Sequence, residues 1–212
     1  MATLRVDAER NRRQLLEAAH VVFADRGLDA PLDDIARRAG VGNATLYRRF
    51  PSRHDLVAAV FSDMLTQVVA ASERAAAVAD PWQGFAEHLT FLCRLQSENR
   101  AFADLLTTRV AAPGLEALRG RALDALEALI HRAKSVNALR SDFSHEDVVV
   151  LLMANAGLLE RTAGTAPTAW RRHLGYLLDG LRTQVEPTST LAPTRQEILR
   201  AMDASAARHG CS

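Results

Sequence analysis

The sequence predicts an all-α protein, and three observations support this fold class. Apolar residues recur at helical spacing along most of the 212 residues. No segment shows the strict alternation of a half-buried strand or a hairpin turn between two such segments. The composition, 48% apolar and 24% charged, is ordinary for a globular protein and supplies enough apolar side chains for a core. We therefore expect a folded bundle of helices.

The amino-terminal part reads as three helices separated by glycine. The first, about residues 7–26, carries one apolar face and ends at Gly27. The second, about residues 32–39, ends at Gly40, and the segment GVGNATLYRRF at 40–50 supplies the third. The residues expected to face inward in the first two helices are Leu15, Ala19, Val22, Phe23, Leu32, Ile35, Ala36 and Ala39.

Longer helices follow in the rest of the chain. A fourth runs from Ser52 towards Val78 and is long enough to belong to two domains. The later helices are expected at about residues 82–97, 100–110, 114–138, 145–163, 170–185 and 194–208. N-terminal caps are expected where Ser52 precedes Asp55, Ser144 precedes Asp147 and Thr194 precedes Glu197.

Charge and helix length suggest a small head on a larger body. Residues 1–54 carry ten arginines against seven acids, a net charge of +3, while the whole chain carries only +1. A basic head fits a nucleic-acid-binding domain, although charge alone is equally consistent with an ordinary surface. We expect a head at 1–51, a body at 52–186 and a C-terminal loop and short helix at 187–212.

The segment at 40–50 has the pattern of a helix that enters a DNA groove. Helix, short turn and short helix is the geometry that projects a second helix from a small core. Val41, Leu46 and Phe50 can turn back towards the first two helices. The side chains left at the surface or its boundary are Asn43, Ala44, Thr45, Tyr47, Arg48 and Arg49. Hydroxyls and arginines suit phosphates, and Asn and Arg suit base edges.

A longer segment strengthens this interpretation. IARRAGVGNATLYRRFPSRHDL at 35–56 resembles the DNA-binding segment of the TetR family of bacterial transcriptional regulators, whose usual form is close to IAxxAGVSxGTLYxYFxSKExL. The resemblance covers about the first quarter of the chain. It implies an N-terminal helix-turn-helix DNA-binding domain joined to an all-helical domain that binds a ligand and dimerises.

The resemblance also implies roles for single residues. Thr45 and Tyr47 would hold phosphates, and Arg53 would anchor the DNA backbone at the start of the fourth helix. The residues nearest the bases would be Asn43, Ala44 and Arg48.

The chain also departs from the family pattern. Gly42 stands where the family usually has a capping Ser, and Ala44 where it usually has Gly. Arg49 replaces a usual aromatic, while Pro31 and His54 replace a usual Thr and an acid. The extra arginine and the lost acid are expected to strengthen phosphate binding, so Arg49 and His54 join the candidate DNA contacts.

A cluster of aromatic residues near one histidine is the candidate effector site of the body. A mostly apolar pocket with few polar groups is typical of small-molecule sites. The candidate ligand-binding residues are Trp82, Phe85, His88, Phe91, Leu92 and Phe102. The alternative is plain core packing, with His88 hydrogen-bonded or at the surface.

The last two long helices of the body are the candidate homodimer interface. VVVLLMANAGLL at 148–159 is apolar almost all round, and a helix of that kind must be covered on more than one side. The candidate interface residues are Leu151, Leu152, Asn155, Leu159, Trp170, Leu174, Leu177 and Leu181. The alternative is a hairpin buried within a monomer. Asn155 needs a polar partner if it is buried, in another helix or in a second subunit.

Other classes of function find little support. We find no fingerprint of a nucleophilic, metal-dependent or dinucleotide-binding enzyme, no metal-ligand spacing and no cofactor motif. Cys93 and Cys211 lie too far apart in sequence to suggest a CxxC motif. No signal segment or membrane span is apparent, so we expect a cytoplasmic protein. The expected function is a repressor that leaves its double-stranded DNA operator when a small-molecule effector binds. The alternative is a ligand-independent repressor or activator.

Overall fold

The computed structural model describes residues 2–99, 102–103, 115–162, 164–182 and 190–208, and over these residues the chain is all-α, as predicted. The only strand-like pairing in these ranges is a single bridge between Leu139 and Arg182. The helices are α1 (Ala2–Arg26), α2 (Leu32–Arg38), α3 (Asn43–Arg49), α4 (Arg53–Ala76), α5 (Pro81–Glu98), α7 (Leu115–Ser135), α8 (His145–Thr162), α9 (Ala169–Leu181) and α10 (Arg195–Arg208).

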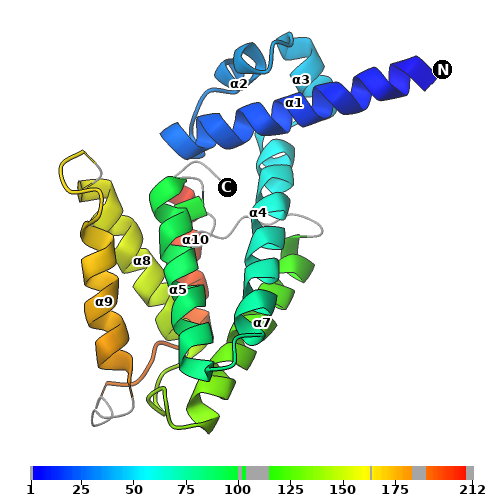
Figure 1. The fold of residues 1–212 in the computed structure, drawn as a ribbon. Coiled ribbons are helices and arrows are strands. Elements are labelled where there is room, and N and C mark those ends of the chain that lie inside the picture. The colour runs from blue at the N-terminus through cyan, green and yellow to red at the C-terminus, as the bar shows by residue number, and fades with distance from the viewer. Residues whose placement is uncertain (1, 100–101, 104–114, 163, 183–189, 209–212) are drawn as a thin grey trace.

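Helices α1, α2 and α3 form a small head at one end of the molecule (Figure 1). Phe23, Ile35 and Leu46, one from each helix, are at most 1% exposed and anchor its core. Gly27 and Gly40 have φ angles of 75° and 68°, a backbone conformation that glycine adopts without strain. The two glycines therefore end α1 and α2 where the sequence predicted.

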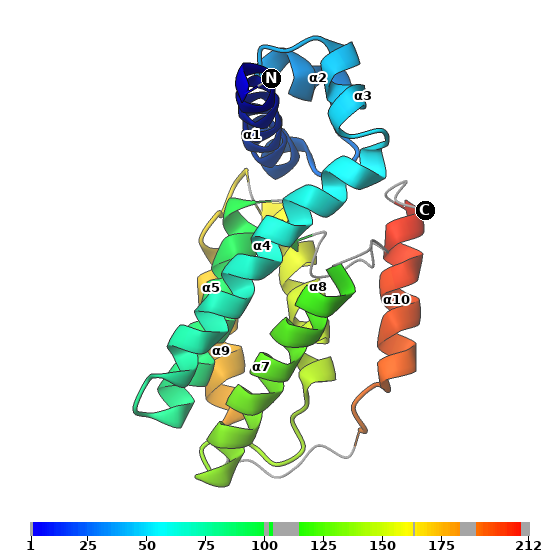
Figure 2. The same ribbon diagram turned by 90° about the vertical axis from the view of Figure 1, so that its right-hand side faces the viewer.

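Helix α4 joins the head to the body and belongs to the core of both (Figure 2). Its N-terminus has the expected capping box, in which the Asp55 amide donates to Ser52 Oγ (3.2 Å) and the Ser52 amide to Asp55 Oδ2 (3.0 Å). By length and composition α4 could cross a membrane, but 56% of its most apolar stretch is buried inside the protein. It is therefore a core helix that packs against both the head and the body.

In the body, α5 contacts α4, α7, α8 and α9, so it lies at the centre of the bundle. At Gly84 the backbone of α5 approaches α4 so closely that a Cβ would lie 2.4 Å from the carbonyl oxygen of Ala75. Arg132 of α7 donates to the carbonyls of Ala76, Val78 and Ala79 at 3.0, 2.6 and 3.1 Å. These bonds satisfy carbonyls that the end of α4 leaves without helical partners.

The predicted boundaries agree with the structure to within a few residues in most helices. The other two predicted caps are also present, since the amides of Ser144 and Thr194 each donate to the carboxylate three residues later, at 2.8 Å. The first helix begins earlier than expected, at Ala2. The predicted helix at 100–110 lies mostly outside the described residues, as does Val185 at the end of the predicted 170–185 segment.

Candidate nucleic-acid interface and effector site

Helix α3 presents one polar face to solvent. Leu46 is 1% exposed and Phe50, which follows α3, is 4% exposed, so both pack inward as predicted. Tyr47 is 48% exposed. The other candidate contacts on α3 that lie at the surface are Asn43, Ala44, Arg48 and Arg49, while Thr45 is half-buried. Five of the six candidate residues on α3 are therefore exposed to solvent.

Polar contacts with α1 and α2 fix the position of α3. Asn43 Nδ2 donates to Asp33 Oδ1 of α2 at 2.9 Å. The guanidinium of Arg12, on α1, lies 5.8 Å from the centre of the Phe50 ring. These contacts hold both ends of a helix only seven residues long, which would have little stability alone.

Arg53 has an internal role that the sequence did not predict. Its Nη1 donates to the carbonyls of Leu28 and Ala30 at 2.6 and 2.8 Å, and the side chain is half-buried. The guanidinium thus ties the loop between α1 and α2 to the start of α4. His54, the neighbouring candidate, is exposed and faces solvent.

The candidate ligand-binding residues separate into two groups. Phe85, His88, Leu92 and Phe102 are 0–3% exposed and pack in the core, and none of these four lines the surface groove that the other two candidates share. Trp82 and Phe91 line a shallow open groove along α5. Five of the six candidates are thus buried, and Phe91 is partly exposed, while Trp82 belongs to the core and also borders the groove.

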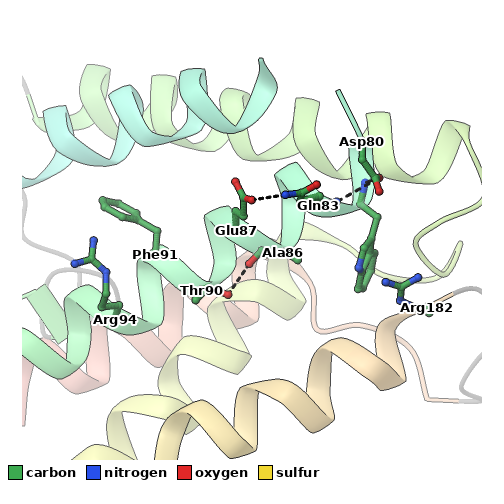
Figure 3. A pocket seen from close by; sticks show the side chains of 9 residues that line it. Asp80, Gln83, Ala86, Glu87, Thr90, Phe91, Arg94 and Arg182 are labelled. Atoms are coloured by element: carbon green, nitrogen blue, oxygen red, sulfur yellow. Dashed lines mark hydrogen bonds between the residues drawn. The ribbon is translucent and has the colours of Figure 1, made fainter. Parts of the chain in front are cut away.

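The groove has a volume of about 550 Å³ and follows the outer face of α5 (Figure 3). Its remaining lining residues are Asp80, Gln83, Ala86, Glu87, Thr90, Arg94 and Arg182. The Arg182 guanidinium stacks 4.6 Å from the Trp82 ring centre, and Gln83 donates to Glu87 at 2.8 Å. The polar lining residues of α5 recur every three or four residues, so the sequence could have predicted that they share one exposed face of this helix. Arg182 follows α9, and no local pattern connects it with α5.

His88 is the most unusual polar residue of the body. It is 2% exposed, and its Nε2 lies 3.4 Å from Ser72 Oγ of α4. Burial lowers the pKa of His88 from 6.5 to about 4, so the ring is neutral near pH 7. Nδ1 is buried and has no hydrogen-bond partner within the described part of the chain. Such an atom costs about 1–3 kcal/mol of stability.

The thiol of Cys93 is not a reactive group. It is fully buried on α5, and burial raises its pKa to about 12. Because the thiolate is the nucleophile and metal ligand, this side chain acts as a small apolar core residue. Within the described ranges no group of three or more His, Cys, Asp or Glu residues could hold a metal ion.

Asn155 makes its polar contact between helices of the same chain. Its Nδ2 donates to Gln96 Oε1 of α5 at 2.8 Å, and Gln96 Nε2 donates to the carbonyl of Leu152 at 3.2 Å. Asn155 Oδ1 is buried without a partner among the described residues. This network connects α5 with α8.

Most of the candidate interface residues lie inside the chain. The buried members are Leu151, Leu152, Asn155, Trp170 and Leu174, each at most 8% exposed. A second subunit could not reach them, because α5 and the α8–α9 packing already cover them. Leu159, Leu177 and Leu181 are partly exposed. The outward side of the two helices instead carries Val150 and Tyr176, which are 44% and 61% exposed.

Family models match both parts of the chain. Residues 15–60 match the model described as "Bacterial regulatory proteins, tetR family". Residues 80–183 match "Transcriptional regulator SbtR-like, C-terminal domain". The first match contains the helix-turn-helix, and the second contains α5, α7, α8 and α9.

Individual relatives agree with these models. A TetR transcription regulatory protein from Mycobacterium vanbaalenii is 33% identical, with 84% of this chain and 99% of that chain covered and a TM-score of 0.55. The transcriptional activator FasR of Mycolicibacterium smegmatis is 32% identical over 149 residues, which are 65% of this chain and 66% of FasR. The transcriptional repressor LfrR of the same organism is 45% identical over 76 residues, which are 36% of this chain and 38% of LfrR.

These relatives are named as transcriptional regulators, in agreement with the expectation that the chain is not an enzyme. The matched models cover the DNA-binding head and the body, and the M. vanbaalenii structure is covered almost completely. The chain belongs to the TetR family of bacterial transcriptional regulators.

Proposed function

We propose that this regulator binds a palindromic operator as a homodimer, with Asn43, Ala44, Tyr47, Arg48 and Arg49 of α3 reading each half-site. The observation that carries the proposal is the exposed polar face of α3 above a buried Leu46. Arginine binds guanine bidentately and small Ala44 permits close approach to a base, while the Tyr47 hydroxyl suits a phosphate.

Two-fold symmetry would supply the second recognition helix. In such dimers the two helices enter successive major grooves about 34 Å apart. The outward side of α8 carries Val150, Ala154 and Gly157, all exposed and at helical spacing, and α9 adds Tyr176. Small and apolar exposed residues of this kind suit close packing between two helix pairs, so this face is our proposed dimer interface.

A small molecule bound in the body would release the operator by favouring a different spacing of the two heads. To change the DNA-competent population from 99:1 to 1:99, the effector must prefer the released state by about 5.5 kcal/mol. A ligand-independent repressor or activator is the second candidate, since LfrR is named a repressor and FasR an activator. We propose the cytoplasm as the location, because bacterial DNA lies there.

The test is a selection of genomic fragments by the purified protein at about 150 mM salt, where non-specific phosphate binding is weakened. We expect an inverted repeat to be enriched. Arg48→Ala should then weaken binding to that repeat by about 10- to 100-fold and relax specificity at one base pair of each half-site.

Arg74→Ala is the matched control, because it removes the same charge from an exposed position near the far end of α4. Equal losses for Arg48→Ala and Arg74→Ala would contradict direct readout by α3. Adding cell-extract fractions to the complex separates the two candidate functions, since only an effector-responsive regulator releases the repeat.

A further inference from the structure

The polar side chains buried in the described residues are few, and none is charged at neutral pH. They are Ser72, His88, Gln96 and Asn155. Two of their atoms, His88 Nδ1 and Asn155 Oδ1, have no hydrogen-bond partner in the described part of the chain. The hydrogen bonds around each atom determine whether it is a donor or an acceptor.

The contacts of Ser72 determine the tautomer of His88. Ser72 Oγ donates its proton to the carbonyl of Val68 at 3.0 Å, the shorter of its two contacts. The same oxygen can therefore only accept from His88 Nε2, 3.4 Å away. Nε2 then carries the proton, and Nδ1 of the neutral ring has a bare lone pair. The unpartnered atom of His88 is an acceptor.

The same reasoning applies to Asn155. The carbonyl of Leu152 can only accept, so the Gln96 atom facing it must be the amide nitrogen. Gln96 Oε1 then accepts from Asn155 Nδ2, which leaves Asn155 Oδ1 without a donor. Two separate networks thus each end in a buried acceptor.

We propose that the effector of this regulator is an uncharged, largely apolar molecule that donates an O–H or N–H hydrogen bond to Nδ1 of His88. The inference rests on the proposed function, which it deepens by naming the chemical class of the effector. An alcohol, a phenol, an amide or an indole has this chemistry. A ketone, an ester or a carboxylate could only place a second acceptor against the lone pair.

The surroundings of His88 support an uncharged partner. The Phe91 ring stacks on the imidazole with centroids 6.4 Å apart and planes 22° apart, and Phe85 is fully buried one turn earlier. No charged side chain is buried among the described residues, so an ionic ligand would lose its hydration without gaining a buried counter-charge. Neutral and aromatic ligands lose little in such a site.

The position of His88 also connects the ligand to the head. Its contact with Ser72 joins α5 to α4, and α4 continues into the helix-turn-helix. A ligand that engages the imidazole acts on the α4–α5 contact directly. The site therefore lies beside α4, the helix whose movement would alter the spacing of the two heads.

The first experiment uses nitrogen NMR of the ¹⁵N-histidine-labelled full chain without DNA. The free protein should show His88 as the Nε2–H tautomer with an unprotonated Nδ1. Indole, which carries one N–H donor, should shift the Nδ1 resonance, whereas indene, of the same shape without a donor, should not. An Nδ1–H tautomer would overturn the proposal, as would an Nδ1 resonance that indole leaves unmoved or indene shifts equally.

Two amide variants test the role of the Nδ1 atom of His88. His88→Asn keeps an acceptor near the position of Nδ1, whereas His88→Gln moves the amide towards the position of Nε2 and leaves no acceptor near that of Nδ1. Indole should bind His88→Asn within about threefold of the wild type and His88→Gln at least about tenfold more weakly. Equal loss in the two variants would show a merely structural histidine and would overturn the proposal.

Circular dichroism confirms that each variant is folded, and His131→Gln is the control at an exposed histidine on α7. Because indole binding is measured without DNA, failure of the operator selection leaves this result unaffected. Conversely, if the protein binds its operator but indole and indene act equally on His88, only this inference is rejected and the proposed function stands.

Discussion

The head and the body use their polar side chains in opposite ways. In the head, the polar groups of α3 lie at the surface, Asn43 is paired with α2, and Arg53 at the start of α4 is paired with the α1–α2 loop. In the body, four neutral polar side chains are buried, and two of them end in an acceptor without a donor. The polar groups of the head are therefore exposed to solvent, whereas the body holds buried acceptor atoms that lack a hydrogen-bond donor within the described residues.

This difference indicates which kind of residue carries function in each region. A surface that meets DNA needs exposed groups on a rigid support, because the phosphates and bases supply the missing partners. A small-molecule site needs a few buried polar groups in an apolar interior, which cost stability until the ligand arrives. Substitutions in the shared core, at the buried polar groups and at the junction of head and body should therefore change stability by different amounts.

The largest expected effect comes from a substitution that tests whether the head and the body unfold together or independently. Phe61 of α4 is fully buried in the continuous core that includes residues of both regions. Phe61→Ala should lower the free energy of unfolding by about 3–5 kcal/mol. Urea denaturation should show one shared transition, with Val21→Ala, at a 45% exposed position, as a near-neutral control. Two separate transitions would mean that head and body fold independently.

The next effect concerns the buried imidazole. Because its pKa is lowered from 6.5 to about 4, the unfolded chain binds a proton that the folded chain does not, and stability falls as pH decreases through this window. The wild type should lose up to about 3 kcal/mol more than His88→Asn between pH 7 and pH 4. Parallel curves of unfolding free energy against pH would contradict a neutral buried His88.

A third prediction separates a structural arginine from a DNA contact. Arg53→Ala removes two hydrogen bonds from a charged group to backbone carbonyls, so it should destabilise the protein by about 2–3 kcal/mol. If Arg53 instead held a phosphate, stability would be unchanged and the slope of log K against log salt would fall by about one. Denaturation and salt titration of the same variant distinguish the two roles.

The smallest effects come from two glycines in the body. Gly84→Ala places a Cβ against the backbone of Ala75 and should cost about 1–3 kcal/mol, because a backbone carbonyl cannot easily move away. Gly120→Ala, in α7 with open space around it, should instead stabilise by about 0.5–1 kcal/mol. The two melting temperatures should move in opposite directions. A common direction would contradict the close approach of α5 and α4.

Local signals predicted the head well. The cap at Ser52 and the inward positions of Leu46 and Phe50 depend on residues within one or two turns, which the sequence shows directly. The internal contacts of Arg53 could not be predicted, because its partners, the carbonyls of Leu28 and Ala30, are more than 20 residues away and carry no side-chain signal. The family pattern suggested a phosphate contact at this position.

The body was harder to predict because its side chains take their roles from packing between helices. Trp82 and Phe85 are three residues apart on one helix and both are buried, yet only Trp82 also lines the groove. The apolar stripes of α8 and α9 correctly predicted that these residues are buried. They did not show whether the covering residues belong to the same chain or to a second subunit. Leu151 and Leu174 are covered within the chain, and predicting this would have required the position of α5 against α8 and α9.

The two ends of α4 are held by different means, a capping box at Ser52 and a clasp formed by Arg132, which donates to the carbonyls of Ala76, Val78 and Ala79. Between these ends lie 24 helical residues, a rod about 36 Å long. A rod of this length works as a lever: a sideways shift of about 2 Å at the clasp tilts it by roughly 3°. In the proposed dimer the two tilts would combine, so a change of atomic size beside His88 would change the distance between the two α3 helices.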